Sequence, residues 1–267
     1  MPRKVVLFTD SVGFGHDVIS SLHDAGLLDE VYVQFSTVQN RMRRYLMDTL
    51  RLRGISRRVV GLVDRLNRPS RTMTIEVDDG VLRKTGAISF TRFREIRERV
   101  VTKDAIVVVY GTGIAPPWVY KDAFQSINVH WGLSPYYRGI LCTDWAILNR
   151  DLFNIGFTLH ELSREVDGGK IITQGRVNPQ AGDSIGTITY RLHHLAKAAL
   201  LKAVSAAQDG PLMGVSQDLT KGRNYTSRDW TIGTSLRLSR RLPIKQRSID
   251  ESGPELPIHE NTSFGPL

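Results

Sequence analysis

Short apolar runs alternate with helical stripes along the first part of the chain. Continuous apolar positions at 4–9, 31–35 and 104–110 predict buried strands, and apolar residues at helical spacing predict helices that begin near residues 13 and 41. The β-branched run at 104–110 is typical of a central strand in a parallel sheet. This order of strands and helices predicts an α/β fold, with a mostly parallel central sheet and helices on both of its faces.

The same alternation continues to about residue 210. The other expected elements are helices at 57–66, 91–101 (with Thr91 as its N-cap), 118–124 and 142–148, a hairpin of strands 72–77 and 81–83 around an Asp-Gly turn, strands at 154–160 and 170–174, and a long helix at 184–208.

The pattern weakens after Pro211, which suggests three parts. We interpret 1–210 as the main domain, 211–248 as an extension and 249–267 as a tail. The tail is rich in Ser, Glu, Pro and Gly, so we expect it to be disordered and dispensable for stability. Residues 224–230 combine aromatic and charged side chains, and we expect them to close over a site or to contact another subunit, as in a homodimer.

The chain is basic, with 36 Lys and Arg against 27 Asp and Glu and a net charge of +9. This charge implies an anionic partner, without choosing among nucleic acid, a phosphorylated metabolite and a polyglutamylated cofactor. Two clusters hold much of it, and solvated helix faces explain them equally well: Arg41, Arg43, Arg44, Arg51, Arg53, Arg57 and Arg58, and Arg237, Arg240, Arg241, Lys245 and Arg247.

Cysteine content and hydropathy exclude several protein classes. Cys142 is the single cysteine, so the chain has no internal disulfide and no zinc site built on paired thiolates. Histidine and carboxylate remain the possible metal ligands, and we assign no metal site. No apolar run is long enough to span a membrane, and residues 1–9 lack a signal cleavage pattern. We therefore expect a cytoplasmic protein that does not bind membranes.

The candidate chemistry lies in the stretch 126–139 and in Asp167. Asn128 and His130 are two residues apart at the end of an expected strand, so their side chains share one face. Together with Asp167 they supply an amide donor, an acid or base and a carboxylate. Such a set suits acyl transfer without a protein nucleophile: Asn128 and protonated His130 stabilise an oxyanion, and His130 or a water held by Asp167 moves protons. On spacing alone, a lone histidine at a strand end is the alternative.

A glycine-rich loop, which contains Gly13, Gly15 and His16, follows the first strand and opens a helix. The first backbone N–H groups of a helix lack partners and can hold a phosphate or carboxylate. The alternatives are a glycine pair that only permits a tight turn and a surface histidine. Three aromatics, Tyr32, Tyr225 and Trp230, could stack on a nucleotide base or belong to the core.

Several motifs together resemble the folate-dependent formyltransferase family. That family includes methionyl-tRNA, glycinamide ribonucleotide and sugar N-formyltransferases. The resemblance covers about residues 105 to 200. It rests on Val-Tyr-Gly at 109–111, Asn-x-His at 128–130, Leu-Ser-Pro-Tyr-Tyr-Arg-Gly at 133–139, Trp-Ala at 145–146, Gly-Phe-Thr-Leu-His at 156–160 and Val-Asp-Gly-Gly-Lys-Ile at 166–171.

The resemblance implies a Rossmann-like formyltransferase fold, N10-formyltetrahydrofolate as formyl donor and an amine as acceptor. It makes Asn128, His130 and Asp167 the catalytic residues. The implied cofactor contacts are Gly111, Thr112, Gly113, Ile114, Ala115 and Val166, and the expected substrate contacts are Gly13, Gly15, His16, Tyr136, Arg138 and Gly139.

Two departures from the family pattern narrow the expected acceptor. The methionyl-tRNA enzymes carry a C-terminal β-barrel where this chain has about fifty weakly patterned residues, and the phosphate loop of the glycinamide ribonucleotide enzymes is replaced here by 10–15. We therefore expect a small anionic amine, a nucleotide-linked amino sugar, rather than nucleic acid. The loop at 132–135 also differs from the usual family sequence, which affects its acceptor contacts.

Other readings remain open from the sequence. The acceptor could be glycinamide ribonucleotide or methionyl-tRNA. A formyltetrahydrofolate hydrolase would use the same three residues to deliver the formyl group to water, usually with an added N-terminal regulatory domain. A basic RNA-binding module would explain the arginines, but it gives no reason for Asn128, His130 and Asp167 together.

Overall fold

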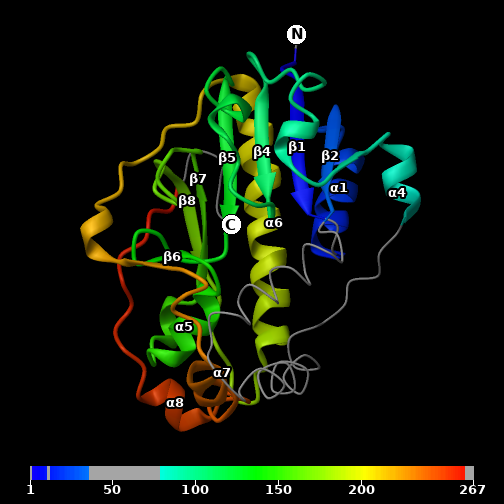
Figure 1. Cartoon of the computed structure of the whole chain (residues 1–267). Helices are drawn as coiled ribbons and strands as arrows, with labels where there is room; N and C mark the ends of the chain where they lie inside the picture. Colours follow the sequence, from blue (N-terminus) through cyan, green and yellow to red (C-terminus); the bar gives the residue numbers. More distant parts are fainter. Residues whose placement is uncertain (1, 11–12, 36–78, 262–267) are drawn as a thin grey trace.

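A seven-stranded sheet runs through the part of the chain that the computed structural model describes, residues 2–10, 13–35 and 79–261 (Figure 1). Its strand order is β3-β2-β1-β4-β5-β7-β8. The first five strands in this order are parallel, and β7 and β8 are antiparallel. The strands are β1 (Val5–Asp10), β2 (Glu30–Gln34), β3 (Ile88–Phe90), β4 (Ile106–Tyr110), β5 (Gln125–His130), β7 (Gly156–His160) and β8 (Ile171–Arg176). The expected α/β fold with a mostly parallel sheet is confirmed.

Alternate side chains of the central strands pack into two hydrophobic cores, one on each face of the sheet. Val5 and Leu7 of β1 pack with α1 (Gly13–Asp24) and with the long helix α6 (Ile185–Asp209). Val6 and Phe8 point to the other face, where short 3-10 turns, η2 (Phe93–Glu95) and η3 (Pro117–Val119), contribute their apolar side chains. The period of two in a strand explains this division, because neighbouring side chains leave opposite faces.

The long helix begins where the sequence predicts it. Ser184 is the N-cap of α6: its hydroxyl accepts the backbone N–H of Thr187, whose side chain reaches back to the N–H of Ser184. Buried apolar residues then recur along one face of the helix as far as Ala207. The buried face of the helix therefore extends along nearly its whole length, and the helix runs beside the strands of the sheet (Figure 1).

A smaller subassembly lies beyond the C-terminal end of β5. It contains β6 (Tyr137–Gly139) paired with β9 (Arg223–Tyr225), together with α5 (Cys142–Leu148), α7 (Ile232–Ser239) and α8 (Gln246–Asp250). Trp145 of α5 stacks on Tyr225 with ring centroids 4.6 Å apart and meets Trp230 edge-on. Tyr32 is buried and stacks on Phe8. All three aromatics considered for base stacking therefore pack inside this chain.

Three predicted elements differ from the structure. Residues 81–83 belong to a helix, α4 (Asp79–Lys84), because Val81 packs into the core beside α1, and the short strand β3 was missed. Residues 91–101 form only η2 and turns. Thr91 is not its N-cap; Arg92 is the N-cap of η2, and the Glu95 carboxylate accepts the N–H groups of Thr91 and Arg92. The expected helix at 118–124 is the single turn η3.

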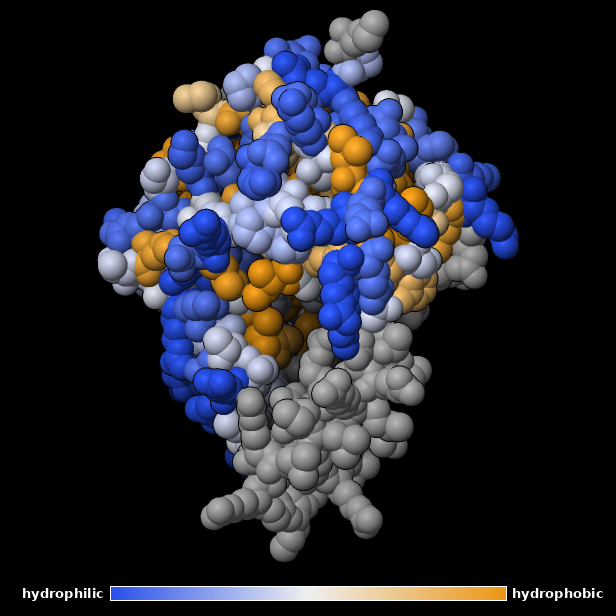
Figure 2. Space-filling view, turned by 45° about the horizontal axis from the view of Figure 1, so that its top comes forward, coloured by the Kyte–Doolittle hydropathy of each residue, from blue (hydrophilic) through white to orange (hydrophobic). Residues whose placement is uncertain are grey.

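The elements expected at 41–52, 57–66 and 72–77 lie outside the described residues. Two further 3-10 turns complete the described chain, η4 (Leu152–Asn154) and η5 (Leu219–Lys221). No helix within the described ranges is long and apolar enough to cross a membrane. On the face shown in Figure 2, hydrophobic side chains gather at a central hollow, and hydrophilic ones lie above it and on either side.

The structure describes the C-terminal tail up to Asn261 and places it against the rest of the chain, which differs from the disorder expected from 249 onward. Buried Asn154 fastens it, because its amide donates to the carbonyl of Pro254 at 2.9 Å and accepts the N–H of Leu256 at 2.8 Å. The hydroxyl of Ser252 accepts the N–H of Leu152. Composition did not predict this docking, because polar and backbone hydrogen bonds hold the segment, together with Ile249 packed against the core.

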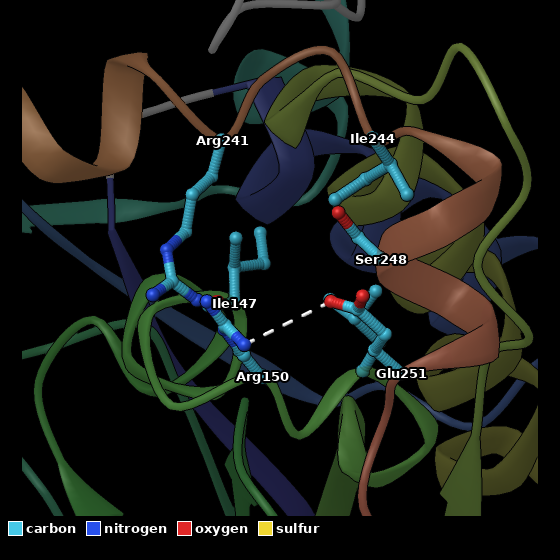
Figure 3. Close-up of a pocket in the computed structure, with 7 residues that line it drawn as sticks. Ile147, Arg150, Arg241, Ile244, Ser248 and Glu251 are labelled. Atoms are coloured by element: carbon cyan, nitrogen blue, oxygen red, sulfur yellow. Dashed lines mark hydrogen bonds and ion pairs between the residues drawn. The ribbon is translucent and has the colours of Figure 1, made fainter.

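Helix α8 and the residues before it dock on the end of α5 around a hollow of about 100 Å³ (Figure 3). Arg241 donates to the carbonyl of Ile147 at 3.1 Å, and Arg150 lies 3.8 Å from the Glu251 carboxylate. The Arg150 and Glu251 side chains are largely exposed, so the pair contributes little. The hydrogen bond from Arg241 to the Ile147 carbonyl therefore contributes more to the docking than this ion pair.

We expect Asn154→Ala to lower the free energy of unfolding by about 2 kcal/mol, because it leaves buried groups of two segments without partners. Urea unfolding measures this difference. Asn224→Ala, at an exposed position on β9, is the matched control and should change stability by less than about 0.5 kcal/mol. Equal effects of the two substitutions would contradict the fastening role of Asn154.

Candidate active site

A cavity of about 390 Å³ opens at the carboxyl ends of β1, β4 and β5. Ligands of open α/β sheets bind at such strand ends. Three aromatic side chains form part of its wall, and the candidate catalytic residues form another part. The lining residues are Asp10, Phe14, Tyr110, Gly111, Thr112, Asn128, Val129, His130, Trp131, Gly139 and Asp167.

The three predicted catalytic residues come together at this cavity. Asn128 and His130 lie at the C-terminal end of strand β5, and Asp167 lies in the connection from β7 to β8. Asp167 Oδ2 is 3.3 Å from Nδ1 of His130. The sequence prediction that these residues meet is therefore matched by the geometry, although 37 positions separate His130 from Asp167.

His130 is buried, and both of its ring nitrogens face oxygen atoms. Nε2 is 2.9 Å from the carbonyl of Tyr137, and Nδ1 faces Asp167. Burial lowers the pKa of His130, although the Asp167 charge and the Tyr137 carbonyl act to raise it. The carbonyl can only accept, so the neutral ring carries its hydrogen on Nε2. A second proton, on Nδ1, would meet the carboxylate of Asp167.

Cys142 begins α5 and lies against His130. Its Sγ is 3.7 Å from Nε2 of His130. Burial, with the charges of Asp167 and Asp144, raises the pKa of the thiol well above its usual value. Cys142 is therefore a neutral packing neighbour of the imidazole rather than a thiolate.

Asp167 is held as a carboxylate. Its backbone adopts φ of 50°, a left-handed conformation that Asp tolerates better than most residues, just before Gly168 and Gly169. Burial acts to raise its pKa, yet the neighbouring His130 and His160 rings and the N–H of Gly139 hold that pKa well below its usual range. The Gly139 N–H donates to Oδ2 at 2.8 Å.

Gly139 can occupy its place only because it lacks a side chain. Its φ is 88°, and a Cβ there would lie 2.1 Å from the carbonyl oxygen of Tyr225. The close approach of β9 therefore places the N–H that Asp167 accepts. Segment 224–230 thus lies beside the site, packed on the strand that contacts it.

His160 is a site residue that the sequence reasoning did not assign. It lies directly opposite Asn128 in the antiparallel pairing of β5 with β7. Its Nδ1 donates to the carbonyl of Glu161 at 2.8 Å, so Nε2 of the neutral ring accepts from the Asn128 amide at 3.0 Å. The other amide hydrogen of Asn128 can then serve a ligand in the cavity. Only the strand register, which the sequence does not show, could have identified this pair.

The loop after β5 is tied to the sheet by two buried polar residues, Thr158 and Gln174. The Thr158 hydroxyl accepts the N–H of Ser134 at 3.0 Å and donates to the carbonyl of Gly132 at 2.7 Å. Gln174 donates to the carbonyl of Ser134 at 2.7 Å. The Ser134–Pro135 bond is cis. These contacts fix the loop to the sheet.

The predicted cofactor contacts are only partly on the cavity. Gly111 and Thr112 line it. Gly113 donates its N–H to Gln34, Ile114 is 81% exposed, and Ala115 is buried in the core of the opposite face. Val166 is half-buried and precedes Asp167.

Among the predicted substrate contacts, only Gly139 lines the cavity. Gly13 begins α1, Gly15 abuts the end of β1 and His16 is buried. Tyr136 is half-buried. Arg138 is buried as well, and its guanidinium donates to the carbonyls of Pro135 and Leu219.

A series of hydrogen-bonded side chains lies behind the cavity wall that Tyr110 forms. The Tyr110 hydroxyl meets Nδ1 of His193 at 2.7 Å, and Nε2 of His193 meets Asp17, which also accepts from Lys197. Phe14 stacks on the His193 ring. These contacts join β4 and α1 to α6 directly under the aromatic wall.

The site has polar groups suited to proton transfer, and no metal cluster accompanies them in the described ranges: no three His, Cys, Asp or Glu side chains there are grouped to hold an ion. The chemistry available is therefore an amide donor, an imidazole and a carboxylate in a partly apolar cavity.

Comparison with known proteins finds similarity over the part of the chain that contains these residues. Residues 91–204 match the sequence model described as formyl transferase. This match makes residues 91–204 similar to the formyl transferase family. The matched segment contains Asn128, His130, His160 and Asp167, so the resemblance noted from the sequence is confirmed.

Two curated relatives match the same part of the chain. Methionyl-tRNA formyltransferase of Desulfotalea psychrophila is 28% identical over 113 residues, which are 42% of this chain and 35% of that protein. The dTDP-4-amino-4,6-dideoxyglucose formyltransferase of Mycobacterium bovis is 31% identical over 94 residues, 35% of this chain and 39% of that protein. The matched stretches thus span little more than a third of these relatives.

The fold similarity extends further than the sequence similarity. An N-formyltransferase from Helicobacter canadensis, solved in complex with folinic acid and dTDP-3-aminofucose, has a TM-score of 0.61 at 13% identity. The comparison covers 89% of this chain and 79% of that one. The formyltransferase fold is therefore shown for most of the chain.

The burial of His130 gives stability a defined pH dependence. The unfolded chain binds a proton near the ordinary pKa of 6.5, whereas the folded chain does so only at lower pH. This stabilisation is full above that pKa and is lost as pH falls below it, with a slope of at most about 1.4 kcal/mol per pH unit. We expect His130→Gln to lose less stability than the wild type between about pH 7.5 and about pH 5.5.

Urea unfolding at both pH values measures the difference, and His23→Gln, at an exposed position on α1, is the control. The control should follow the wild type. A wild type whose stability falls no more than that of His130→Gln would show that the imidazole is not held neutral by the fold.

Proposed function

We propose that this chain transfers the formyl group of N10-formyltetrahydrofolate to the primary amine of a nucleotide-linked amino sugar. The observation that carries the proposal is the convergence of Asn128, His130 and Asp167 on one cavity within the segment that matches formyl transferases. The activity and the substrates extend beyond what that segment establishes, and they rest on the arguments below.

The cavity is compatible with a folate. Its volume of about 390 Å³ is in the range of small-molecule sites, and Phe14, Tyr110 and Trp131 offer apolar surface to a flat ring. Gly111 and Thr112 add backbone groups at the end of β4. Bound N10-formyltetrahydrofolate would supply an activated formyl group. The H. canadensis protein, which shares the fold, was solved with folinic acid.

The three catalytic side chains have separate roles in the proposed reaction. Asn128 directs its free amide hydrogen at the oxygen on which negative charge develops, because His160 holds the other amide hydrogen. His130 and Asp167 act as one proton-holding pair. The proton lost by the attacking amine would be held on Nδ1 of His130, between the imidazole and the Asp167 carboxylate, and passed to the nitrogen that departs as its bond to the formyl carbon breaks. Tyr137 keeps the ring oriented through Nε2.

The electrostatics of the cavity favour the amine end of an acceptor. Asp10 and Asp167 both line it, so a phosphate would be repelled there while an ammonium group would be attracted. The phosphates would then lie outside the cavity, on a chain whose net charge is +9. Two of the similar proteins are described with dTDP-linked amino sugars. A nucleotide-linked amino sugar combines these charges in one small molecule.

The central test is a panel of amines incubated with protein and N10-formyltetrahydrofolate, read as the mass gained when a formyl group replaces a hydrogen. We expect gain on a nucleotide-linked amino sugar, and His130→Ala should lower kcat by about 10² to 10⁴-fold. Asp167→Asn should lower kcat more than it weakens donor binding, because its charge matters as charge develops.

His23→Ala is the matched histidine control and should keep wild-type turnover. Wild-type turnover in His130→Ala would exclude the assigned roles. A wild type that gives no mass gain on any amine while it releases formate would indicate a hydrolase.

Salt dependence separates a sugar acceptor from tRNA. A nucleotide-linked sugar engages few phosphates, so its KM should rise only modestly with salt, whereas binding of tRNA through many phosphates weakens steeply. Initial rates for both acceptors across a salt series measure this. We expect a shallow slope and negligible formylation of methionyl-tRNA. Efficient, steeply salt-dependent formylation of methionyl-tRNA would overturn the sugar acceptor and leave formyl transfer intact.

A further inference from the structure

Gln174 connects two segments that are far apart in the sequence. It lies on β8, the last strand of the sheet, and is 1% exposed. Its amide nitrogen donates to the carbonyl of Ser134 at 2.7 Å and to the hydroxyl of Thr158 at 2.9 Å. Its amide oxygen accepts the backbone N–H of His259 at 3.0 Å. One side chain therefore spans from the loop after β5 to the C-terminal segment.

The orientation of this amide is fixed by its partners. The Ser134 carbonyl can only accept and the His259 N–H can only donate, so nitrogen must face the loop and oxygen must face residue 259. The backbone repeats the tie, because the Gln174 N–H donates to the carbonyl of His259 at 2.8 Å. A flipped amide would place two donors together and two acceptors together.

The loop that Gln174 contacts also holds the catalytic histidine, His130. Ser134 and Gly132 are both bonded to Thr158, and the next turn closes with the Tyr137 N–H on the Leu133 carbonyl at 2.8 Å. The Tyr137 carbonyl then holds Nε2 of His130. A shift of the loop would therefore rotate the imidazole or release it from this carbonyl.

The other end is the C-terminal strap, by which we mean residues 252–261. Polar contacts hold it at four points along η4 and β8, where it covers the exposed edge of the sheet. The contacts join Ser252 to Leu152, Asn154 to Pro254 and Leu256, Arg176 to Glu255, and Thr173 to Asn261. The strap is thus placed independently of the Gln174 side chain.

We infer that the C-terminal strap positions the catalytic loop, with Gln174 as the positioning residue that transmits its hold to His130. The inference rests on the proposed formyl transfer for its kinetic part. When the strap is removed, the amide oxygen of Gln174 loses its fixed donor, and the amide can turn away from Ser134. The site would keep its residues and lose their alignment, which costs rate rather than binding.

The test uses two truncations of the full chain. Deletion of residues 258–267 removes His259 and Asn261, whereas deletion of 262–267 leaves every described strap contact in place and is the control. Turnover is measured well below the melting temperature of both. We expect the longer deletion to lower kcat about 10-fold with little change in KM, and the control to match the wild type.

An activity-independent readout accompanies the kinetics. Deuterium uptake of the peptide 131–139, followed by mass spectrometry, should rise in the longer deletion and stay at the wild-type level in the control. This outcome can be seen even if the protein transfers no formyl group, so failure of the proposed function and failure of the inference are distinguishable. Unchanged uptake and unchanged kcat in the longer deletion would overturn the inference.

Two substitutions of His259 distinguish loss of the contact to Gln174 from general destabilisation by truncation. His259→Pro removes the one backbone N–H that Gln174 accepts, and His259→Ala keeps it. We expect His259→Pro to reproduce the lowered kcat and raised uptake, and His259→Ala to behave as the wild type. Equal behaviour of the two variants would also overturn the role assigned to Gln174.

Discussion

The ionised carboxylate of Asp167 is the constraint on which the arrangement of this site depends. It lies within 3.5 Å of His130 and His160 and accepts the N–H of Gly139 at 2.8 Å. A buried carboxylate costs much free energy unless it is paired and hydrogen-bonded. The structure meets that need with groups from β5, β7 and β6. Because those three strands must converge for this purpose, the carboxylate sets the geometry of the cavity as well as its charge.

The same constraint explains the division between a neutral imidazole and a charged neighbour. Burial disfavours a proton on His130, and the adjacent carboxylate favours one, so the two effects oppose each other at the same nitrogen. A small change in the cavity, such as exclusion of water by a bound ligand, can therefore move the balance. A group in this condition can take a proton during a reaction and release it afterwards, which is what an amine acceptor requires.

The sequence predicted the strands and helices whose apolar pattern is continuous, including β1, β4, α5 and α6, because burial on one or both faces fixes such patterns directly. It failed at 81–83, where Val81 packs into the core, and at 91–101, where the chain forms only η2 and turns. Asn128, His130 and Asp167 were recognisable from motif and spacing. His160 was not, because its partnership with Asn128 is set by antiparallel register, and no local pattern reveals register.

The C-terminal segment shows a limit of composition as a guide to order. A segment with few apolar residues cannot form a core of its own, but it can add to the edge of a sheet whose backbone groups need partners. Residues 252–261 do this beside β8, and the buried amides of Asn154 and Gln174 supply fixed attachment points. Since Gln174 also bonds the loop after β5, the ordering of the chain end and the alignment of His130 share one side chain. Order at the edge of this sheet is thereby tied to the geometry at the carboxyl end of its β5 strand.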